Sequence, residues 1–207
     1  MSVYLKRLKS YKDWKENKIL VIHMITPMLD VETCLNMSKI PFEAISIESN
    51  NFELEIRKNI KESSGIIITG SRKKGDLLPG LPDIVTEVGL PILGICYGNE
   101  WLCQILDGSL IECNPPIGEH SEVECILGDS LLFKGIKDKE QIVTMAHDYM
   151  ISELPIGSKS IASTDLTPIS GFELLSKKMF GLQFHPEKGY LGELIFSNFF
   201  KYCTTSR

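Results

Sequence analysis

Cys96 stands in a Gly-Ile-Cys-Tyr-Gly segment, residues 94–98, which has the spacing of a nucleophile at a sharp turn. An apolar strand pattern precedes the cysteine and a helical pattern follows it. In such an elbow the nucleophile takes strained backbone angles, and Gly94 and Gly98 avoid a collision two positions to either side. The helix N-terminus favours a thiolate, and the backbone N–H of Tyr97 is placed to stabilise an oxyanion. We therefore predict a nucleophile; a buried structural cysteine is the alternative.

A histidine and a carboxylate two residues apart supply the groups that such a nucleophile needs. They lie in Gly-Leu-Gln-Phe-His-Pro-Glu, residues 181–187. Because Pro186 disfavours helix at His185, the chain there is predicted to be extended, so His185 and Glu187 point to the same side. We predict that His185 accepts the Cys96 proton and returns it to the leaving group, while Glu187 orients the imidazole.

The elements that must position these residues alternate between strands and helices. Continuous apolar runs are typical of strands that are buried on both faces. The predicted strands are 18–25, 44–47, 65–69 and 91–95, and the predicted helices are 31–38, 52–62 and 81–88. This alternation predicts an α/β fold with a mostly parallel sheet and helices on both faces. Functional residues then gather beyond the carboxyl ends of the strands.

The second half of the chain has a different pattern, in which short strands follow one another. Several of them are expected to be antiparallel, and an aromatic-rich helix ends the chain. The predicted strands are 110–113, 123–127, 141–146, 160–164, 172–175 and 179–184, and the helix is 192–203. Since there is no internal repeat, we predict one domain over residues 18–207, preceded by a basic extension over residues 1–17.

Composition excludes several other classes of protein. The 207 residues carry a net charge of −5, and 43% of them are hydrophobic, as in a globular domain with a core. No apolar run is long enough for a membrane span, and the N-terminus is too polar for a signal peptide. Six cysteines show no zinc spacing. We therefore expect a cytoplasmic protein with no metal, no organic cofactor and no membrane contact.

Charge is unevenly distributed. Residues 1–18 have a net charge of about +4, which leaves about −9 on the remainder. An acidic body argues against nucleic acid as the main ligand. The basic stretch is either a solvated helical extension or a contact for an acidic partner.

The two motifs, taken together with their order and spacing, resemble class I glutamine amidotransferase domains. The resemblance runs from about residue 18 to residue 203 and implies a three-layer, flavodoxin-like open sheet. It also implies a γ-glutamyl thioester on Cys96 and delivery of ammonia to a synthase. The loop at Gly70 corresponds to the oxyanion loop of the family, where the Gly70 N–H would join that of Tyr97. Segments 143–148 and 181–187 are most similar to the glutaminase domain or subunit of GMP synthetases.

The resemblance places further residues around the substrate, and some of them depart from the family pattern. The implied substrate-binding residues are Glu100, Ser71, His120, Ser121 and His147. Glu100 replaces the usual glutamine, and Ser71 replaces the second glycine of the usual Gly-Gly-Pro loop. The loop that follows the first strand, at His23, lacks the Asp and Gln typical of GMP synthetases. These changes leave the proposed triad intact but bear on the substrate and on the ammonia acceptor.

Three functions remain open from the sequence. The first is a glutaminase that supplies ammonia to a separate synthase subunit. The second is a stand-alone γ-glutamyl hydrolase or peptidase, which the acid at position 100 favours. The third is a non-catalytic regulatory or binding protein on a degenerate amidotransferase fold. The substrate is glutamine or another γ-glutamyl compound in the first two cases.

Overall fold

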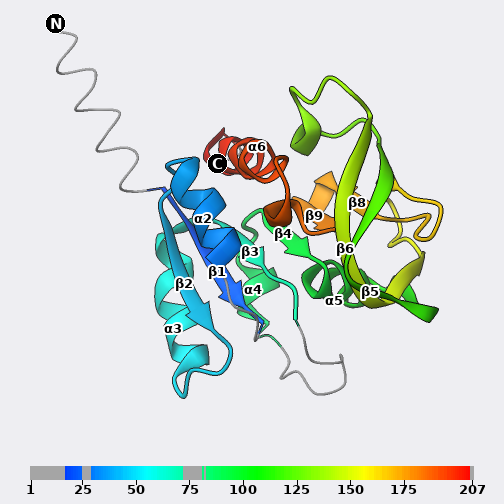
Figure 1. The fold of residues 1–207 in the computed structure, drawn as a ribbon. Helices are drawn as coiled ribbons and strands as arrows, with labels where there is room; N and C mark the ends of the chain where they lie inside the picture. The colour runs from blue at the N-terminus through cyan, green and yellow to red at the C-terminus, as the bar shows by residue number, and fades with distance from the viewer. Residues whose placement is uncertain (1–16, 25–28, 72–80, 82, 206–207) are drawn as a thin grey trace, which may run out of the picture.

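The fold is known from a computed structural model that describes residues 17–24, 29–71, 81 and 83–205, apart from the side chains of Glu119 and His120. Within this described part, nine strands form one sheet in the order β2-β1-β3-β4-β9-β8-β7-β5-β6 (Figure 1). The strands are β1 (Lys18–His23), β2 (Phe42–Ser46), β3 (Ser63–Ile68), β4 (Ile92–Ile95), β5 (Ser109–Leu127), β6 (Glu140–Glu153), β7 (Lys159–Ser163), β8 (Gly171–Leu174) and β9 (Met179–Leu182). The predicted extension over residues 1–17 lies outside the described residues, except for Asn17.

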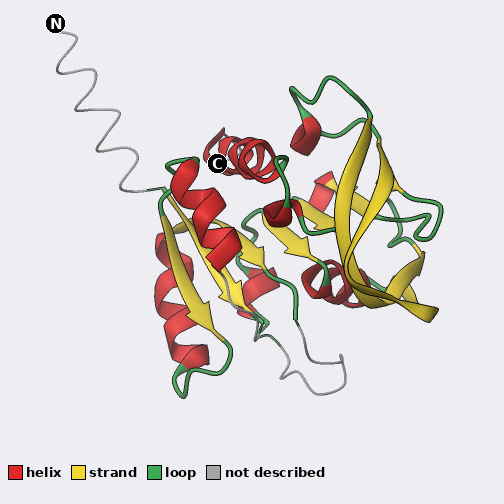
Figure 2. Cartoon of the chain, in the orientation of Figure 1, coloured by secondary structure: helices red, strands yellow, loops and turns green. Residues whose placement is uncertain are grey.

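The helices lie on both faces of the sheet (Figure 2). They are α2 (Leu29–Met37), α3 (Phe52–Asn59), α4 (Ile84–Glu87), α5 (Tyr97–Ile105) and α6 (Gly192–Thr205), with 3-10 turns η1 (Ile60–Glu62), η3 (Leu131–Phe133), η4 (Leu175–Lys177) and η5 (Pro186–Lys188). The predicted α/β class with helices on both faces is therefore confirmed.

Alternate residues of the central strands build two separate cores. One core joins α2 and α6 to one face of the sheet, with Val21 of β1 and Phe180 of β9 between them. The other core joins α3, α4 and α5 to the opposite face, with Leu20 of β1 and Ile68 of β3. Each strand thus buries side chains on both sides, which explains its continuous apolar sequence.

The parallel part of the sheet comprises β2, β1, β3, β4 and β9. This is the 2-1-3-4-5 strand order of flavodoxin-like folds. The remaining joins, from β9 through β8, β7 and β5 to β6, are antiparallel. The antiparallel section therefore covers as much of the sheet as the parallel section, which is more than the sequence predicted.

Two strands of the antiparallel section are longer than predicted. The segments at 110–113 and 123–127 belong to one strand, β5, whose pairing with β6 shifts in register on both sides of Ile117. Backbone hydrogen bonds between β5 and β6 keep the polar residues between these segments extended, although they lack an apolar pattern. The two strands form a long hairpin, and β6 is an edge strand of the sheet.

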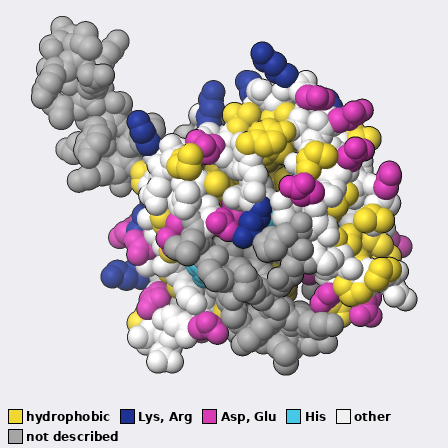
Figure 3. All heavy atoms as spheres, in the orientation of Figure 1, with side chains coloured by type: hydrophobic (Ala, Val, Ile, Leu, Met, Phe, Trp, Pro, Cys, Tyr) yellow, Lys and Arg dark blue, Asp and Glu magenta, His cyan; other side chains and the backbone are white. Residues whose placement is uncertain are grey.

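The surface mixes charges of both signs. On the face shown in Figure 3, acidic and basic side chains lie among apolar ones over the described residues. Among the described residues, no helix is both long enough and apolar enough to cross a bilayer.

Candidate active site

Cys96 lies at the junction of β4 and α5 with a backbone φ of +52° and ψ of −107°. A residue other than glycine rarely takes such a conformation, which concentrates at functional sites. A Cβ on Gly94 would lie 2.3 Å from the Gly98 oxygen, and a Cβ on Gly98 would lie 2.4 Å from the Ile68 oxygen. The predicted elbow, including the need for both glycines, is therefore confirmed.

His185 and Glu187 meet beside this elbow. The Nδ1 atom of His185 lies 2.8 Å from Oε1 of Glu187, and both side chains are largely buried. The backbone of His185 is extended, as predicted, and its N–H donates to the Thr144 oxygen of β6 at 2.8 Å. Glu187, however, lies in the 3-10 turn η5 and not in extended chain. The prediction of an extended pair was wrong on this point, because Pro186 starts a turn that brings the carboxylate back to the ring.

The sulfur of Cys96 contacts His185 and the edge strand of the hairpin. The thiol forms a hydrogen bond with His185, and its Sγ lies 3.4 Å from the Ala146 oxygen of β6. Since Glu187 occupies Nδ1 of the imidazole, the Nε2 atom is the one available to Cys96. Strand β4 thus leads to Cys96, strand β9 leads to His185, and strand β6 supplies the Ala146 oxygen.

Burial and hydrogen bonding shift the pKa values of Cys96 and His185 in opposite directions. Burial raises the pKa of the Cys96 thiol, and the hydrogen bond to His185 counteracts it. Burial lowers the pKa of His185, but hydrogen bonds to Cys96 and Glu187 outweigh burial and raise the pKa to about 10. His185 is therefore able to hold a proton taken from Cys96 near neutral pH.

Gly70 lies directly against the side chains of Cys96 and His185. A Cβ at this position would lie 3.0 Å from Cε1 of His185 and 3.3 Å from Cβ of Cys96. The preceding Thr69 fixes the loop, because its hydroxyl accepts from the Met24 N–H at 3.1 Å and donates to the Gly70 oxygen at 3.2 Å. Tyr97 begins α5, where N–H groups have no partner within the helix. The two predicted oxyanion residues thus flank Cys96, and their role stays a prediction.

Glu100 is held by the amide of Gln183, which is held in turn by the amide of Asn99; sequence reasoning missed both. Its Oε1 accepts from Nε2 of Gln183 at 2.9 Å, and Oε1 of Gln183 accepts from Nδ2 of Asn99 at 2.8 Å. Gln183 and Asn99 are fully buried. Burial raises the pKa of Glu100 to about 7. The signal for Gln183 was its place two residues before His185, on the same side of an extended chain.

The other predicted substrate residues occupy more varied places. Ser71 follows Gly70 in the same loop, and Ser121 is a β5 residue that donates to the Gly118 oxygen at 3.0 Å. The side chain of His120 lies outside the described part. His147 is buried, with Nδ1 2.8 Å from the Tyr149 oxygen and Nε2 3.4 Å from the Thr167 hydroxyl. Both ring nitrogens of His147 have partners within the fold, and its contact with substrate stays a prediction.

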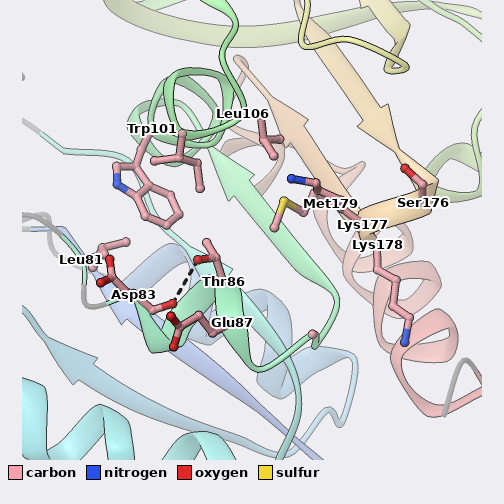
Figure 4. Close-up of a pocket in the computed structure, with 12 residues that line it drawn as sticks. Leu81, Asp83, Thr86, Glu87, Trp101, Leu106, Ser176, Lys177, Lys178 and Met179 are labelled. Carbon is pink, nitrogen blue, oxygen red and sulfur yellow. Dashed lines mark hydrogen bonds between the residues drawn. The ribbon is translucent and has the colours of Figure 1, made fainter.

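A separate cavity of about 760 Å³ opens at the other end of the same strands (Figure 4). It lies between α4, the second half of α5 and the turn that leads into β9. The residues that line it are Leu81, Asp83, Thr86, Glu87, Gly89, Trp101, Ile105, Leu106, Ser176, Lys177, Lys178 and Met179. Met179 begins β9, whereas His185 lies beyond its end. This cavity is therefore distinct from the surroundings of Cys96.

Comparison with protein families gives a match over most of the chain. The family described as "Glutamine amidotransferase class-I" matches residues 36–201. Curated relatives include proteins named "GMP synthase [glutamine-hydrolyzing]". The one from Clostridium botulinum (strain Kyoto / Type A2) is 37% identical over 154 residues, and the one from Clostridium kluyveri (strain ATCC 8527) is 35% identical over 144 residues. These matches cover 70% and 67% of this chain, but the chain spans only about 30% of the length of those relatives.

Solved structures share the fold at lower sequence identity. A protein from Thermoplasma acidophilum, described as a putative subunit of GMP synthase, aligns with a TM-score of 0.72 and 22% identity, over 93% of this chain and 96% of that one. A glutamine amidotransferase from Thermotoga maritima aligns with a TM-score of 0.60 and 17% identity, over 83% of this chain and 76% of that one. At these identities the likeness establishes the fold.

Proposed function

The chain belongs to the class I glutamine amidotransferase family, and we propose that it hydrolyses the side-chain amide of glutamine through a γ-glutamyl thioester on Cys96. The observation that carries the proposal is the strained Cys96 elbow in hydrogen-bond contact with His185, whose other ring nitrogen is held by Glu187. A nucleophile, a base and an orienting acid meet there, as covalent acyl transfer requires.

In the proposed reaction each group has one role. His185 takes the proton of Cys96 as the sulfur attacks the amide carbon. The N–H groups of Gly70 and Tyr97 stabilise the oxyanion that forms. His185 then gives the proton to the departing nitrogen. Ammonia leaves, and the γ-glutamyl group remains on Cys96 as a thioester. Water, deprotonated by His185, attacks the thioester, and glutamate and the free thiol of Cys96 are released.

We further propose that the ammonia passes to a separate synthase subunit. The curated relatives are named glutamine-hydrolysing GMP synthases, and the similar Thermoplasma acidophilum protein is described as one subunit of a GMP synthase. A cytoplasmic location fits the six cysteines, none of which forms a disulfide, because disulfides rarely persist in reducing compartments.

A γ-glutamyl hydrolase that needs no partner is the second candidate function. The observation that favours it is the carboxyl group of Glu100 in the first turn of α5, beside the nucleophile. An acid there alters the charge presented to the substrate. Both candidates use the same nucleophile and differ in the amine that leaves.

The test is to measure glutamate release from glutamine and from γ-glutamyl dipeptides, with and without the Cys96→Ala substitution. We expect glutamine turnover that Cys96→Ala abolishes and that Cys125→Ala, the same change at a buried cysteine of β5, preserves. Preferential cleavage of the dipeptides would favour the second candidate. Glutamine turnover that survives Cys96→Ala would overturn both.

A further inference from the structure

We propose that Cys34 of α2 and Gly192 of α6 are positioning residues, which form a tightly packed seat for the η5 turn and so hold the Glu187 carboxylate against His185. The seat is the contact of Cys34 and Gly192 with the backbone of Pro186 and Glu187. This inference rests on the proposed function and adds to it two residues that act through Glu187.

The hydrogen bond between Glu187 and His185 joins two segments that different elements hold. His185 is anchored on the β5–β6 hairpin, because its backbone N–H donates to the Thr144 oxygen of β6 at 2.8 Å. The η5 turn that carries Glu187 contacts α2 and α6, which pack against each other on one face of the sheet (Figure 1). The 2.8 Å distance from Nδ1 of His185 to Oε1 of Glu187 therefore depends on how these two helices hold the turn.

The Glu187 carboxylate has few side-chain contacts that could fix its place. Its Oε1 atom is engaged by His185. Its Oε2 atom is buried and has no hydrogen-bond partner within the described segments, although buried polar atoms usually have one. The position of the carboxylate must therefore come from the backbone of the η5 turn.

That backbone is packed against Cys34 and Gly192 without free space. A Cβ on Gly192 would lie 2.8 Å from the Pro186 oxygen, 2.9 Å from Sγ of Cys34 and 3.3 Å from Cα of Glu187. Cys34 closes the seat from α2, since its Sγ lies 3.8 Å from the Glu187 oxygen, as a weak thiol donor does. Both residues are buried. Because a close-packed interior transmits displacements, a change of volume at either residue should move Glu187.

An ion pair also joins α2 to this turn, but it holds the turn less firmly. Nζ of Lys188 pairs with Oδ2 of Asp30, and the two side chains are 32% and 46% exposed. Exposed ion pairs stabilise little, because water and salt screen them. The buried seat, and not the ion pair, is therefore expected to set the position of Glu187.

The first experiment compares Gly192→Ala with Gly189→Ala in steady-state hydrolysis of glutamine. The methyl group at position 192 must displace the backbone of η5. We expect kcat to fall at least about tenfold, since a misplacement of about 1 Å can cost about 10²-fold, and KM to change less than about twofold. Gly189→Ala, at the other end of the same turn, is the matched control, because nothing lies within 4 Å of its Cβ position.

The second experiment tests whether the effect passes through Glu187. Gly192→Ala is added to Glu187→Gln, and kcat is compared with that of Glu187→Gln alone. If Gly192 acts by placing the carboxylate, the added methyl group should lower kcat by at most about twofold once the carboxylate is gone. A residue that merely supports the fold would lower kcat by the same factor in both backgrounds.

The third experiment asks whether space on the α2 side relieves the turn. Cys34→Ala removes the sulfur that faces the new methyl group. Added to Gly192→Ala, it should raise kcat at least about threefold, because the methyl group then has room away from η5. Two changes that only destabilise the fold would not rescue each other. Thermal melts confirm that each variant is folded at the assay temperature, and Cys34→Val, which enlarges the seat from α2 alone, replaces Gly192→Ala if that variant does not fold.

The outcomes separate this inference from the function on which it rests. Absence of glutamine turnover in the native chain would overturn both. Turnover by the native chain with equal kcat in Gly192→Ala and Gly189→Ala would overturn the seat alone, as would a Gly192→Ala effect of the same size in the Glu187→Gln background. A loss of kcat that requires Glu187 and that Cys34→Ala relieves would establish the inference.

Discussion

At the reacting atoms, the proposed chemistry depends on where one proton resides. Cys96 is nearly completely buried, and burial raises the pKa of its thiol. The hydrogen bond to His185 lowers that pKa and so favours the thiolate. Glu187 supports the protonated imidazole from Nδ1. The pair is therefore suited to move the proton reversibly and not to hold a permanent thiolate. This accounts for the need for all three side chains.

Replacing Glu187 by Gln should lower kcat for glutamine by about 10³- to 10⁴-fold. The amide keeps the size of the side chain but does not stabilise imidazolium, and it can hold His185 in the wrong tautomer. Steady-state kinetics at neutral pH, with a thermal melt to confirm folding, measure the effect. Glu193→Gln, the same change at an exposed residue of α6, is the control. Near-normal turnover in Glu187→Gln would remove the carboxylate from the mechanism.

Glu100 should make stability depend on pH in an identifiable window. Its pKa is raised from an ordinary value of 4.5 to about 7 in the folded state, so the folded protein binds this proton more tightly than the unfolded chain. Its favourable contribution is present below pH 4.5 and is lost as the pH rises towards 7. The loss amounts to roughly 3 kcal/mol at most.

Glu100→Gln should therefore be more stable than the native chain at pH 8, with a smaller difference at pH 5. Urea unfolding at the two pH values gives both free energies of unfolding. Because the substitution cancels only the titration of this group, the difference between the two proteins should grow from pH 4.5 to about pH 7 and level off above it. A difference that does not change with pH would show that Glu100 does not titrate in this range.

At the scale of single elements, two glycines let β3, β4 and α5 approach closely enough to form the elbow. Gly98→Ala should destabilise the fold by about 1–3 kcal/mol, since its Cβ would lie 2.4 Å from the backbone oxygen of Ile68 and overpack the contact. Gly118→Ala is the matched control, because nothing lies within 4 Å of its Cβ position. Equal midpoints of thermal unfolding for the two variants would contradict the packing account.

The elbow was predictable from sequence because its constraints are local. Gly94, Cys96 and Gly98 act on one another within five residues, as do the strand before them and the helix after them. The turn at Glu187 was mispredicted even though it is local, since the spacing of His185 and Glu187 suits both an extended chain and a 3-10 turn. The pattern indicated which residues meet but not the backbone path between them.

The contacts of Glu100 were not predictable because they join segments far apart in the chain. Gln183 reaches Asn99 and Glu100 across more than 80 residues, and only the pairing of β4 with β9 brings them together. The length of β5 escaped prediction for a related reason. Its middle is held extended by hydrogen bonds to β6, a property of the pair and not of either sequence.

At the scale of the whole molecule, the site lies where the parallel and antiparallel sections of the sheet meet. β4 ends at Cys96 and its neighbour β9 leads to His185, while β6 from the antiparallel hairpin contacts both residues through the Ala146 and Thr144 oxygens. Neither section alone contains the arrangement. The two halves of the chain, which looked different in sequence, are therefore both required for the proposed function.

The most direct test of the account is covalent labelling of the intact protein by a glutamine-derived affinity reagent, followed by mass spectrometry of its peptides. Six buried cysteines compete for the reagent. The account predicts that one label appears, on the peptide that contains Cys96, and that excess glutamine protects this residue. Labelling spread over several cysteines, or a Cys96 label that glutamine does not reduce, would contradict the central claim that Cys96 is a nucleophile for a γ-glutamyl substrate.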